Sequence, residues 1–307
     1  MMKKYDVIIL GGGPAGLTAG IYASRAGLDC LVIEKGIFGG LITEAEVVEN
    51  YPGFPEGISG LELGDLLHRQ AVLHGVDTLI AEFMAFDVER DNKIVHTNED
   101  DFIARAIIIA LGSERKTLGV KGETELLGHG VSYCATCDAA FFRDQLVAVV
   151  GGGDVAVTEA LHLTKFASKV VIIHRRDQLR ATYVLQRKAF AQSKIEILWD
   201  TVVDSIEGIE QVKELKLKNL KTNQKSSLEL DGVFISVGFK PNSDYFKVQL
   251  SLDSSGLIIT DNRMETNLPG IFAAGDIRFG STWQAISAAG DGATAAINAE
   301  RYLSKLS

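Results

Sequence analysis

The stretch DVIILGGGPAG (residues 6–16) and its near-repeat LVAVVGGGDVA (146–156) decide the fold of this chain, and they align without gaps. Each begins as a Val/Ile/Leu run typical of a parallel strand buried on both faces, then passes through a glycine turn into a helical pattern. A second apolar run follows in each case, LVIE (31–34) and VIIH (171–174). The chain therefore contains two strand–turn–helix–strand units of the kind that bind dinucleotides.

Further strands indicate that one of these units is inserted into the other. IIIALGS (107–113) and GIFAAGDI (270–277) are apolar runs that end at glycines, and the second unit lies between them with its own strand GVFISVG (232–238). The polar, turn-rich segments SERKTLGVKGE and GFKPNSD make the two crossings. We therefore predict an α/β protein with two Rossmann-like dinucleotide-binding domains, in which residues 116–242 are inserted between residues 1–115 and 243–307.

The composition is that of an ordinary globular protein with a net charge of −9. Acidic proteins are poor nonspecific binders of nucleic acid and of anionic membranes. No apolar run approaches the roughly 18 residues that a membrane-spanning helix needs. The start MMKKYDVIILGGGPAG superficially resembles a signal peptide, but its apolar run (7–10) is short and ends in three glycines. We expect a cytoplasmic protein that binds neither nucleic acid nor membranes.

The first glycine loop has the spacing of a dinucleotide site. Gly11 permits the tight turn, Gly13 lets a pyrophosphate approach the backbone, and Gly16 lets the helix pack closely on the strand. The helix N-terminus then offers free N–H groups to the phosphates. Glu34 follows at the end of the second strand, where a carboxylate can accept hydrogen bonds from ribose hydroxyls. The alternative is a purely structural glycine turn.

The second glycine loop, with Gly151, Gly153 and Ala156, is followed by a different strand end. His174 stands where the first unit has Glu34, and the segment HRRDQLR (174–180) adds Arg175, Arg176 and Arg180. A carboxylate would repel a ribose 2′-phosphate, whereas guanidinium groups bind phosphate with two hydrogen bonds. This segment therefore predicts a preference for NADP(H) over NAD(H). The alternative is a solvated basic helix start.

The cysteines indicate redox chemistry. Three cysteines, an odd and small number, do not make a secreted disulfide framework. Cys134 and Cys137 form a C-x-x-C, which in a cytosolic enzyme favours a redox pair. The alternative is half of a zinc site, for which His129 is the only other soft ligand nearby in the sequence. Cys30, inside the run LDCLVIE, is expected to be a buried and inert thiol.

The chain resembles the low-molecular-weight thioredoxin reductase family over essentially its whole length. The C-x-x-C followed by aspartate, shortly before the second glycine loop, separates this family from other two-domain flavoproteins. The resemblance implies FAD in the outer domain, NADPH in the insert, a homodimer, and a thioredoxin or thioredoxin-like protein as substrate. The matching motifs, in order, are GGGPAG (11–16), VENYPGFP (48–55), CATCD (134–138), GGGDVAVTEA (151–160), HRRDQLR (174–180), VGFKPN (237–242) and FAAGDI (272–277).

The same resemblance implies roles for individual residues. Cys134 would attack the thioredoxin disulfide, Cys137 would be the flavin-facing sulfur, and Asp138 would be the general acid. A helix N-cap is the alternative role of Asp138, and the two roles can coexist. Further FAD contacts would come from Pro14, Ala15, Lys35, Gly40, Leu41, Asn50, Gly112, Gly275, Asp276, Ile277, Trp283, Gln284 and Ala285, and further NADPH contacts from Asp154 and Val155. Leu41, Val155 and Trp283 depart from the family pattern, in which glutamine, a small polar residue and arginine are common.

Other functions remain open from the sequence. A flavin-dependent dithiol oxidase would have little use for HRRDQLR, and a flavodoxin or ferredoxin reductase would not need Cys134 and Cys137. A non-enzymatic dinucleotide sensor is a third possibility. Reduction of thioredoxin at the expense of NADPH, without peroxide, distinguishes the expected reductase from all three.

Overall fold

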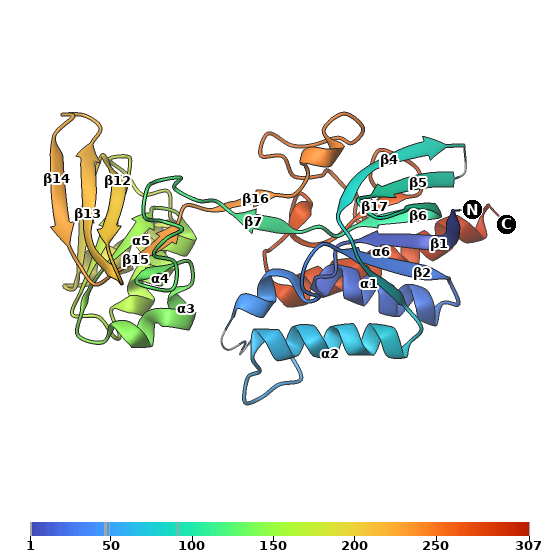
Figure 1. Ribbon diagram of the computed structural model, residues 1–307, viewed down its shortest axis with the longest axis horizontal. Coiled ribbons are helices and arrows are strands. Elements are labelled where there is room, and N and C mark those ends of the chain that lie inside the picture. The colour runs from blue at the N-terminus through green and yellow to red at the C-terminus, as the bar shows by residue number, and fades with distance from the viewer. Residues whose placement is uncertain (1, 46–47, 49, 91, 307) are drawn as a thin grey trace. The chain divides into compact units, whose positions relative to one another are not determined.

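The computed structural model describes residues 2–45, 48, 50–90 and 92–306, except for the side chain of Cys137. The chain forms two compact units. The outer unit consists of Met1–Glu114 and Lys240–Ser307, and the inserted unit of Arg115–Phe239. The chain passes between them at β7 (Ser113–Arg115) and β16 (Phe239–Pro241), two strands that pair with each other (Figure 1).

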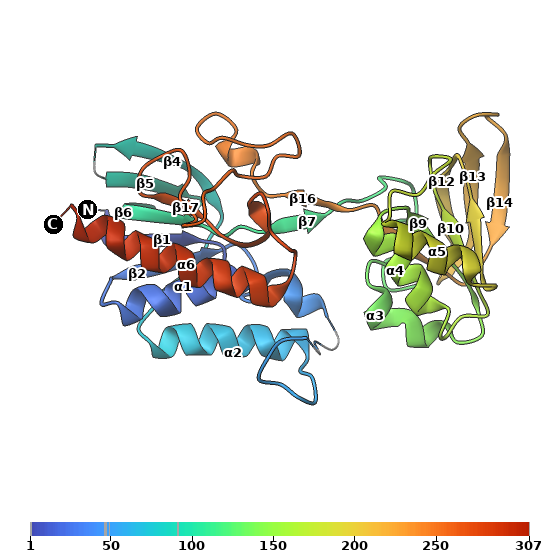
Figure 2. The ribbon, with the colours of Figure 1, turned by 180° about the vertical axis from the view of Figure 1, so that it is seen from behind.

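The outer unit is built on a mixed sheet with strand order β3-β2-β1-β6-β5-β4, in which β17 also pairs with β6. β1, β2, β3, β6 and β17 pair in parallel, and β4, β5 and β6 form an antiparallel meander. Helices α1 and α6 run side by side along one face of the sheet, with α2 next to α1 (Figure 2). The elements are β1 Lys3–Leu10, α1 Pro14–Arg25, β2 Cys30–Glu34, η1 Gly40–Glu44, α2 Gly60–Leu73, β3 Asp77–Ile80, β4 Phe83–Glu89, β5 Asn92–Thr97, β6 Asp101–Ile109, η3 Asp244–Phe246, β17 Ile271–Ala273, η4 Gly275–Ile277 and α6 Ala285–Ser304.

The strands of the outer sheet read as continuous apolar runs because both faces of the sheet are covered. On one face, Val7, Ile9 and Val32 pack against the helices. On the other, Ile8 and Leu10 pack with aromatic and aliphatic side chains of β4 and of the segment after β16. Successive strand residues point to opposite faces, so alternate residues enter two separate cores. The glycine loop after β1 is therefore held on a rigid strand.

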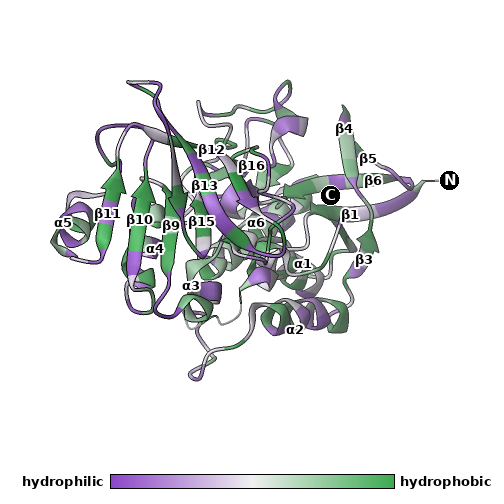
Figure 3. Cartoon of the chain, turned by 60° about the vertical axis from the view of Figure 1, so that its left-hand side comes forward, coloured by the Kyte–Doolittle hydropathy of each residue, from purple (hydrophilic) through white to green (hydrophobic). Residues whose placement is uncertain are grey.

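The inserted unit repeats the parallel arrangement and adds a second sheet. Its parallel sheet has strand order β11-β10-β9-β15-β8, and an antiparallel sheet of β12, β13 and β14 packs on one face. α4 and α5 pack on the other face. In Figure 3, β9, β10, β11 and β15 are mostly apolar, whereas β13 alternates in polarity. The elements are β8 Val131–Ser132, α3 Ala135–Asp138, η2 Ala139–Phe142, β9 Leu146–Gly151, α4 Asp154–Leu163, β10 Lys169–Ile173, α5 Tyr183–Ala191, β11 Ile195–Leu198, β12 Thr201–Gly208, β13 Val212–Asn219, β14 Lys225–Glu229 and β15 Gly232–Ser236.

The predicted α/β class with parallel sheets is confirmed, and both glycine loops follow the first strand of a parallel β–α–β unit. Within the described residues, no helix combines the length and the apolar character needed to cross a membrane.

Candidate functional site: two glycine loops and a redox segment

In the first glycine loop, two glycines have no room for a side chain, whereas the third faces open space. A Cβ on Gly11 (φ +104°) would lie 2.3 Å from the carbonyl oxygen of Ala110, and one on Gly16 would lie 1.8 Å from that of Gly11. A Cβ on Gly13 would meet its nearest neighbour, the carbonyl oxygen of Gly39, only at 3.8 Å. The protein's own packing therefore demands glycine at positions 11 and 16. Position 13 instead leaves backbone open to a ligand, as a pyrophosphate site requires.

The helix that follows this loop presents its N-terminus to the open side. Gly13 is the N-cap of α1 with Pro14 at the first position, and no side chain caps the helix. Helix N-terminal N–H groups without an intrahelical partner bind phosphate oxygens well. Ala15 is buried beneath this turn. The geometry therefore fits the phosphates of a dinucleotide.

Glu34 is fixed beside the loop by backbone donors. Its Oε2 accepts from the Gly12 N–H at 2.7 Å, and its Oε1 accepts from the Gly36 N–H at 2.9 Å. Each carboxylate oxygen keeps further lone-pair capacity for a ribose hydroxyl. Glu34 and the exposed Lys35 line a cavity of about 170 Å³. Its walls also include Ala81, Glu82, Leu111 and Asn242, which the sequence reasoning did not identify.

The other predicted FAD residues of the first half of the chain lie in the loops around this unit. Gly40 (φ +64°) and Leu41 begin η1, and Gly112 (φ +62°) follows β6. Asn50 is exposed, and its Nδ2 donates to Gln284 Oε1 at 3.1 Å. This bond joins two predicted FAD residues that are far apart in the sequence.

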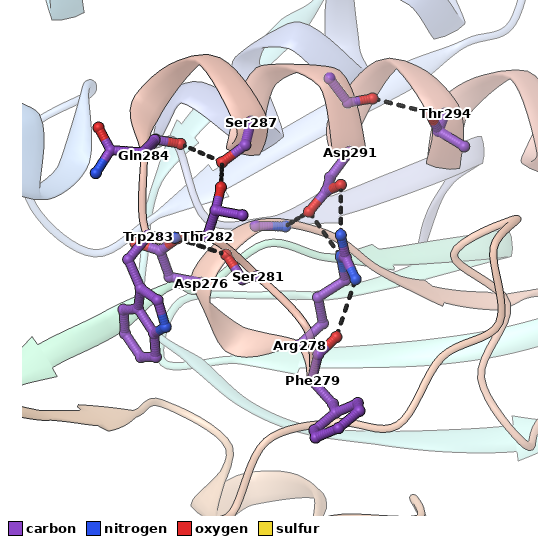
Figure 4. Close-up of polar contacts among 12 residues, drawn as sticks. Asp276, Arg278, Phe279, Ser281, Thr282, Trp283, Gln284, Ser287, Asp291 and Thr294 are labelled. Atoms are coloured by element: carbon purple, nitrogen blue, oxygen red, sulfur yellow. Dashed lines mark hydrogen bonds and ion pairs between the residues drawn. The ribbon is translucent and has the colours of Figure 1, made fainter. Parts of the chain in front are cut away.

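Figure 4 shows the polar contacts that organise the loop from Gly275 to Ala285. Asp276 Oδ1 accepts from Ser281 Oγ at 3.0 Å, and burial raises the pKa of the Asp276 carboxyl. The Trp283 N–H donates to the same Ser281 Oγ at 3.2 Å, in a residue with φ +57°. Ser281 therefore links Asp276 to Trp283. Ile277, also predicted as an FAD contact, is fully buried in the apolar core of the outer unit.

A buried ion pair supports this loop from the helix behind it. Asp291, on α6, accepts from Arg278 Nε at 2.6 Å and from Arg278 Nη2 at 2.8 Å, while the Gly275 N–H donates to it at 3.2 Å. Only 10% of the Asp291 side chain and 17% of the Arg278 side chain are exposed. The sequence reasoning missed this pair, although an aspartate within the alanine-rich stretch after residue 285 was a signal for it.

Breaking the pair gives a stability prediction. Arg278→Met should lower the free energy of unfolding by about 3–5 kcal/mol, because it leaves the Asp291 carboxylate buried without its cation. Urea unfolding monitored by circular dichroism measures the change. The matched control is Arg69→Met on α2, whose guanidinium pairs with Asp65 at an exposed site and should change stability by less than about 1 kcal/mol. Equal effects of the two substitutions would contradict the assignment.

The second glycine loop has the same division between packed and open positions. A Cβ on Gly151 would lie 2.4 Å from Ser236 O, and one on Gly152 would lie 2.2 Å from His174 Nδ1. A Cβ on Gly153 would meet nothing within 4 Å, so this position is open like Gly13. Ala156 is fully buried, whereas Asp154 and Val155 are exposed at the start of α4. This loop also fits a pyrophosphate.

His174 is a buried structural residue of the second loop. Its side chain lies against Gly152, where the first loop has Glu34, and its Nε2 donates to the Gln178 carbonyl at 2.9 Å. Burial lowers the pKa of His174, so the imidazole stays neutral and takes no phosphate charge. Its contribution is to hold the 174–180 segment in place.

The arginines of the 174–180 segment are exposed and available to an anion. Arg175, Arg176 and Arg180 are exposed, and in the described part of the chain no carboxylate pairs with their guanidinium groups. The neighbouring carboxylate of Asp177 is held by Lys221 at 3.0 Å. The Arg180 N–H donates to Gly152 O at 2.7 Å, which ties the segment to the glycine loop. Positive charge is therefore gathered beside an open phosphate position.

The redox segment belongs to the inserted unit. Cys134 is disulfide-bonded and directly precedes α3, which contains the backbone of Cys137. Asp138 is half-buried at the end of α3 and makes no capping hydrogen bond with its side chain. Cys30 is a free, buried thiol whose pKa is raised to about 12 by burial, which fits the expected inert role. A disulfide sulfur is not a thiolate ligand, so Cys134 in this state does not bind zinc.

Comparison with known proteins gives one consistent family. The family model described as pyridine nucleotide-disulphide oxidoreductase matches residues 5–293. The chain is 47% identical over 305 residues to a thioredoxin reductase of Bacillus subtilis, covering 99% of this chain and 96% of that protein. It is 46% identical to a thioredoxin reductase of Listeria innocua, with 99% and 95% covered.

Solved structures agree with these relatives. A crystal structure of Lactococcus lactis thioredoxin reductase in its FR conformation matches with a TM-score of 0.80 and 42% identity, covering 98% of this chain and 99% of that one. The thioredoxin reductase of Streptococcus pyogenes matches with a TM-score of 0.80 and 43% identity, covering 99% and 100%. The chain therefore belongs to the thioredoxin reductases of the pyridine nucleotide-disulphide oxidoreductase family, which use FAD and NADPH.

Proposed function

We propose that this chain reduces the disulfide of a thioredoxin-like protein, with FAD held by the outer unit and NADPH by the inserted unit. When bound, NADPH would supply a hydride, and FAD would accept it and pass two electrons to a disulfide, because a disulfide does not accept a hydride from a nicotinamide directly at a useful rate. The observation that carries the proposal is that Cys134 is in a disulfide on the same unit as the arginine-lined glycine loop.

The different strand ends support the assignment of the two cofactors to the two units. Glu34 presents a carboxylate beside Gly12, which suits ribose hydroxyls and repels a 2′-phosphate. Beside Gly152 the equivalent position is the neutral, buried His174, and the exposed arginines follow it. NADPH, with its 2′-phosphate, suits the second loop. FAD, which lacks that phosphate, suits the first.

The proposed chemistry of the protein residues lies at the redox segment. Cys134 attacks the partner's disulfide as a thiolate, forming a mixed disulfide that Cys137 then resolves. Each attack forms one S–S bond and breaks another, and the departing thiolate takes up a proton. Asp138, next to Cys137, is proposed to move these protons. Its half-buried carboxyl is not occupied by a helix cap.

The arginines give a prediction about coenzyme choice. Arg175→Gln with Arg176→Gln should raise the KM for NADPH roughly 10- to 100-fold. Bonds to charged groups contribute up to about 1.5–3 kcal/mol each, and solvent screening at these two exposed arginines lowers each contribution below that range. The KM for NADH should barely change, because NADH has no 2′-phosphate. Steady-state kinetics with both coenzymes, using thioredoxin as acceptor, measures the two values.

The control for this experiment is Lys213→Gln, which removes an exposed positive charge from β13 of the same unit. It should leave both KM values unchanged. Equal losses with NADPH and NADH in the arginine variant would show that these side chains do not read the 2′-phosphate. An unmodified enzyme that prefers NADH would contradict the proposed coenzyme.

We further propose that the enzyme is a cytoplasmic homodimer that binds neither nucleic acid nor membranes. The net charge of −9 supports the absence of such partners. Exposed apolar side chains on α2, namely Leu61, Leu66, Val72 and Leu73, support an association surface on the outer unit. Sedimentation equilibrium at micromolar concentration tests the dimer, and a monomer there would contradict it.

A further inference from the structure

The residue directly before Cys134 is held by the segment that enters the inserted unit. Tyr133 donates its hydroxyl hydrogen bond to Glu123 Oε1 at 2.7 Å, and its carbonyl accepts a hydrogen bond from Arg115 Nη1. The guanidinium of Arg115, at the end of β7, lies 5.8 Å from the ring centre of Phe239 at the start of β16. Tyr133 is therefore tied to both strands through which the chain enters and leaves this unit.

Glu123 is a buried carboxylate that neither nucleotide loop uses. Only 3% of the residue is exposed. Besides Tyr133, it accepts from the Leu118 N–H at 2.8 Å and from the Gly119 N–H at 2.7 Å. A buried carboxylate is costly unless donors satisfy it, and charge-assisted bonds of this kind are strong and directional. Burial raises the pKa of the Tyr133 hydroxyl and Glu123 raises it further, so this hydroxyl remains a donor.

The peptide of Cys134 itself is fixed as well. The Cys134 N–H donates to Ser132 Oγ at 3.0 Å, and Ser132 is buried. The backbone on the N-terminal side of Cys134 is therefore held by Ser132, by Arg115 and, through Tyr133, by Glu123. In the dithiol state, the position of the Cys134 sulfur therefore depends mainly on rotation of its own side chain.

We propose that Glu123 and Tyr133 are positioning residues for the redox pair, which hold Cys134 where disulfide closure with Cys137 is favoured. The inference rests on the proposed function, which assigns that pair. Closure of the dithiol breaks two S–H bonds, forms one S–S bond and transfers two electrons and two protons to an acceptor such as glutathione disulfide. Its equilibrium constant reflects the effective concentration of one thiol at the other, which falls when the segment that carries Cys134 loosens.

Tyr133→Phe tests the proposal because it removes the hydroxyl and keeps the ring. The purified holoenzyme is equilibrated with reduced and oxidised glutathione, its thiols are trapped by alkylation, and the peptide carrying residues 134–137 is quantified by mass spectrometry. We expect the equilibrium constant for closure to fall about tenfold, which is ~30 mV for a two-electron couple. The matched control is Tyr183→Phe in the same unit, whose residue is 74% exposed and which should change nothing.

Glu123→Gln should shift the equilibrium in the same direction, and its melting temperature shows whether the fold is kept. In the double variant, the combined effect should be smaller than the sum of the two single effects, because the two residues share the Tyr133–Glu123 hydrogen bond. A Tyr133→Phe enzyme with the same closure constant as Tyr183→Phe would overturn the inference. Full additivity in the double variant would also overturn it. A wild-type enzyme in which NADPH produces no dithiol at residues 134–137 would instead contradict the proposed function.

Discussion

Cys134→Ser and Cys137→Ser are each expected to abolish the reduction of thioredoxin, by at least about a thousandfold, while NADPH still reduces the bound flavin. Thiol–disulfide exchange needs a thiolate, and a serine hydroxyl at neutral pH supplies no comparable nucleophile. Reduction of the flavin does not involve the redox pair, so it should keep its rate. Stopped-flow absorbance of the flavin and a thioredoxin-coupled assay measure the two steps separately.

The chain supplies its own control for the cysteine variants. Cys30 is buried, with its Sγ 3.7 Å from the carbonyl oxygen of Gly20, and it belongs to the core of the outer unit. Cys30→Ala should therefore retain thioredoxin reduction. The Cys134→Ser variant should differ from Cys137→Ser in leaving Cys137 free to interact with the oxidised flavin, visible as a change in the flavin spectrum. Substantial thioredoxin reduction by either active-site variant would refute the redox pair.

Asp138→Asn is expected to slow the thiol–disulfide steps by about 10²-fold, since general acid–base groups typically contribute about 10²–10⁴-fold. The substitution keeps the size of the side chain and removes its ability to carry a proton. Hydride transfer from NADPH should keep its rate, so the loss should appear only after flavin reduction. The pH profile of the thiol–disulfide step should change as well. Rapid-mixing kinetics with oxidised thioredoxin across pH 6–9 measures these effects.

Asp144→Asn is the matched control for this variant. Asp144 is exposed in the same unit and adopts φ +59°, a conformation that asparagine tolerates. This control should leave every step unchanged. If Asp138→Asn also leaves the thiol–disulfide rates and their pH profile unchanged, the carboxyl of Asp138 has no proton-transfer role.

The fold could be predicted from the sequence because its strongest signals are local. The apolar run at residues 7–10 and the glycines that follow specify a strand, a turn and a helix within a few residues of one another, and the stretch 146–156 repeats the pattern. The antiparallel sheet of β12–β14 was not predicted, although β13 alternates polar and apolar residues from Glu214 to Lys218. This period of two is typical of a strand with one buried face.

Site residues could be predicted from the sequence only where the residue type and its spacing already indicate a function. Clustered arginines predict phosphate binding and a C-x-x-C predicts redox chemistry. The identity of a histidine, in contrast, does not predict whether its side chain is buried. His174 belongs to the segment predicted to bind NADP(H), which stays a prediction, and the structure shows that its side chain is buried against Gly152. Glu123 and Asp291 could not be identified from sequence because their partners lie at other points of the chain, so that burial and hydrogen bonding appear only in the folded structure.

The central claim is that electrons pass from NADPH through FAD to the Cys134–Cys137 pair and then to thioredoxin. The most direct test is an anaerobic titration of the purified holoenzyme with NADPH, monitored by flavin absorbance and followed by addition of oxidised thioredoxin. The account predicts full reduction with about two equivalents of NADPH per chain, one for each two-electron centre. It further predicts that thioredoxin reoxidises the enzyme and appears as a dithiol. A flavin that NADPH does not bleach, or a reduced enzyme that thioredoxin does not reoxidise, would contradict it.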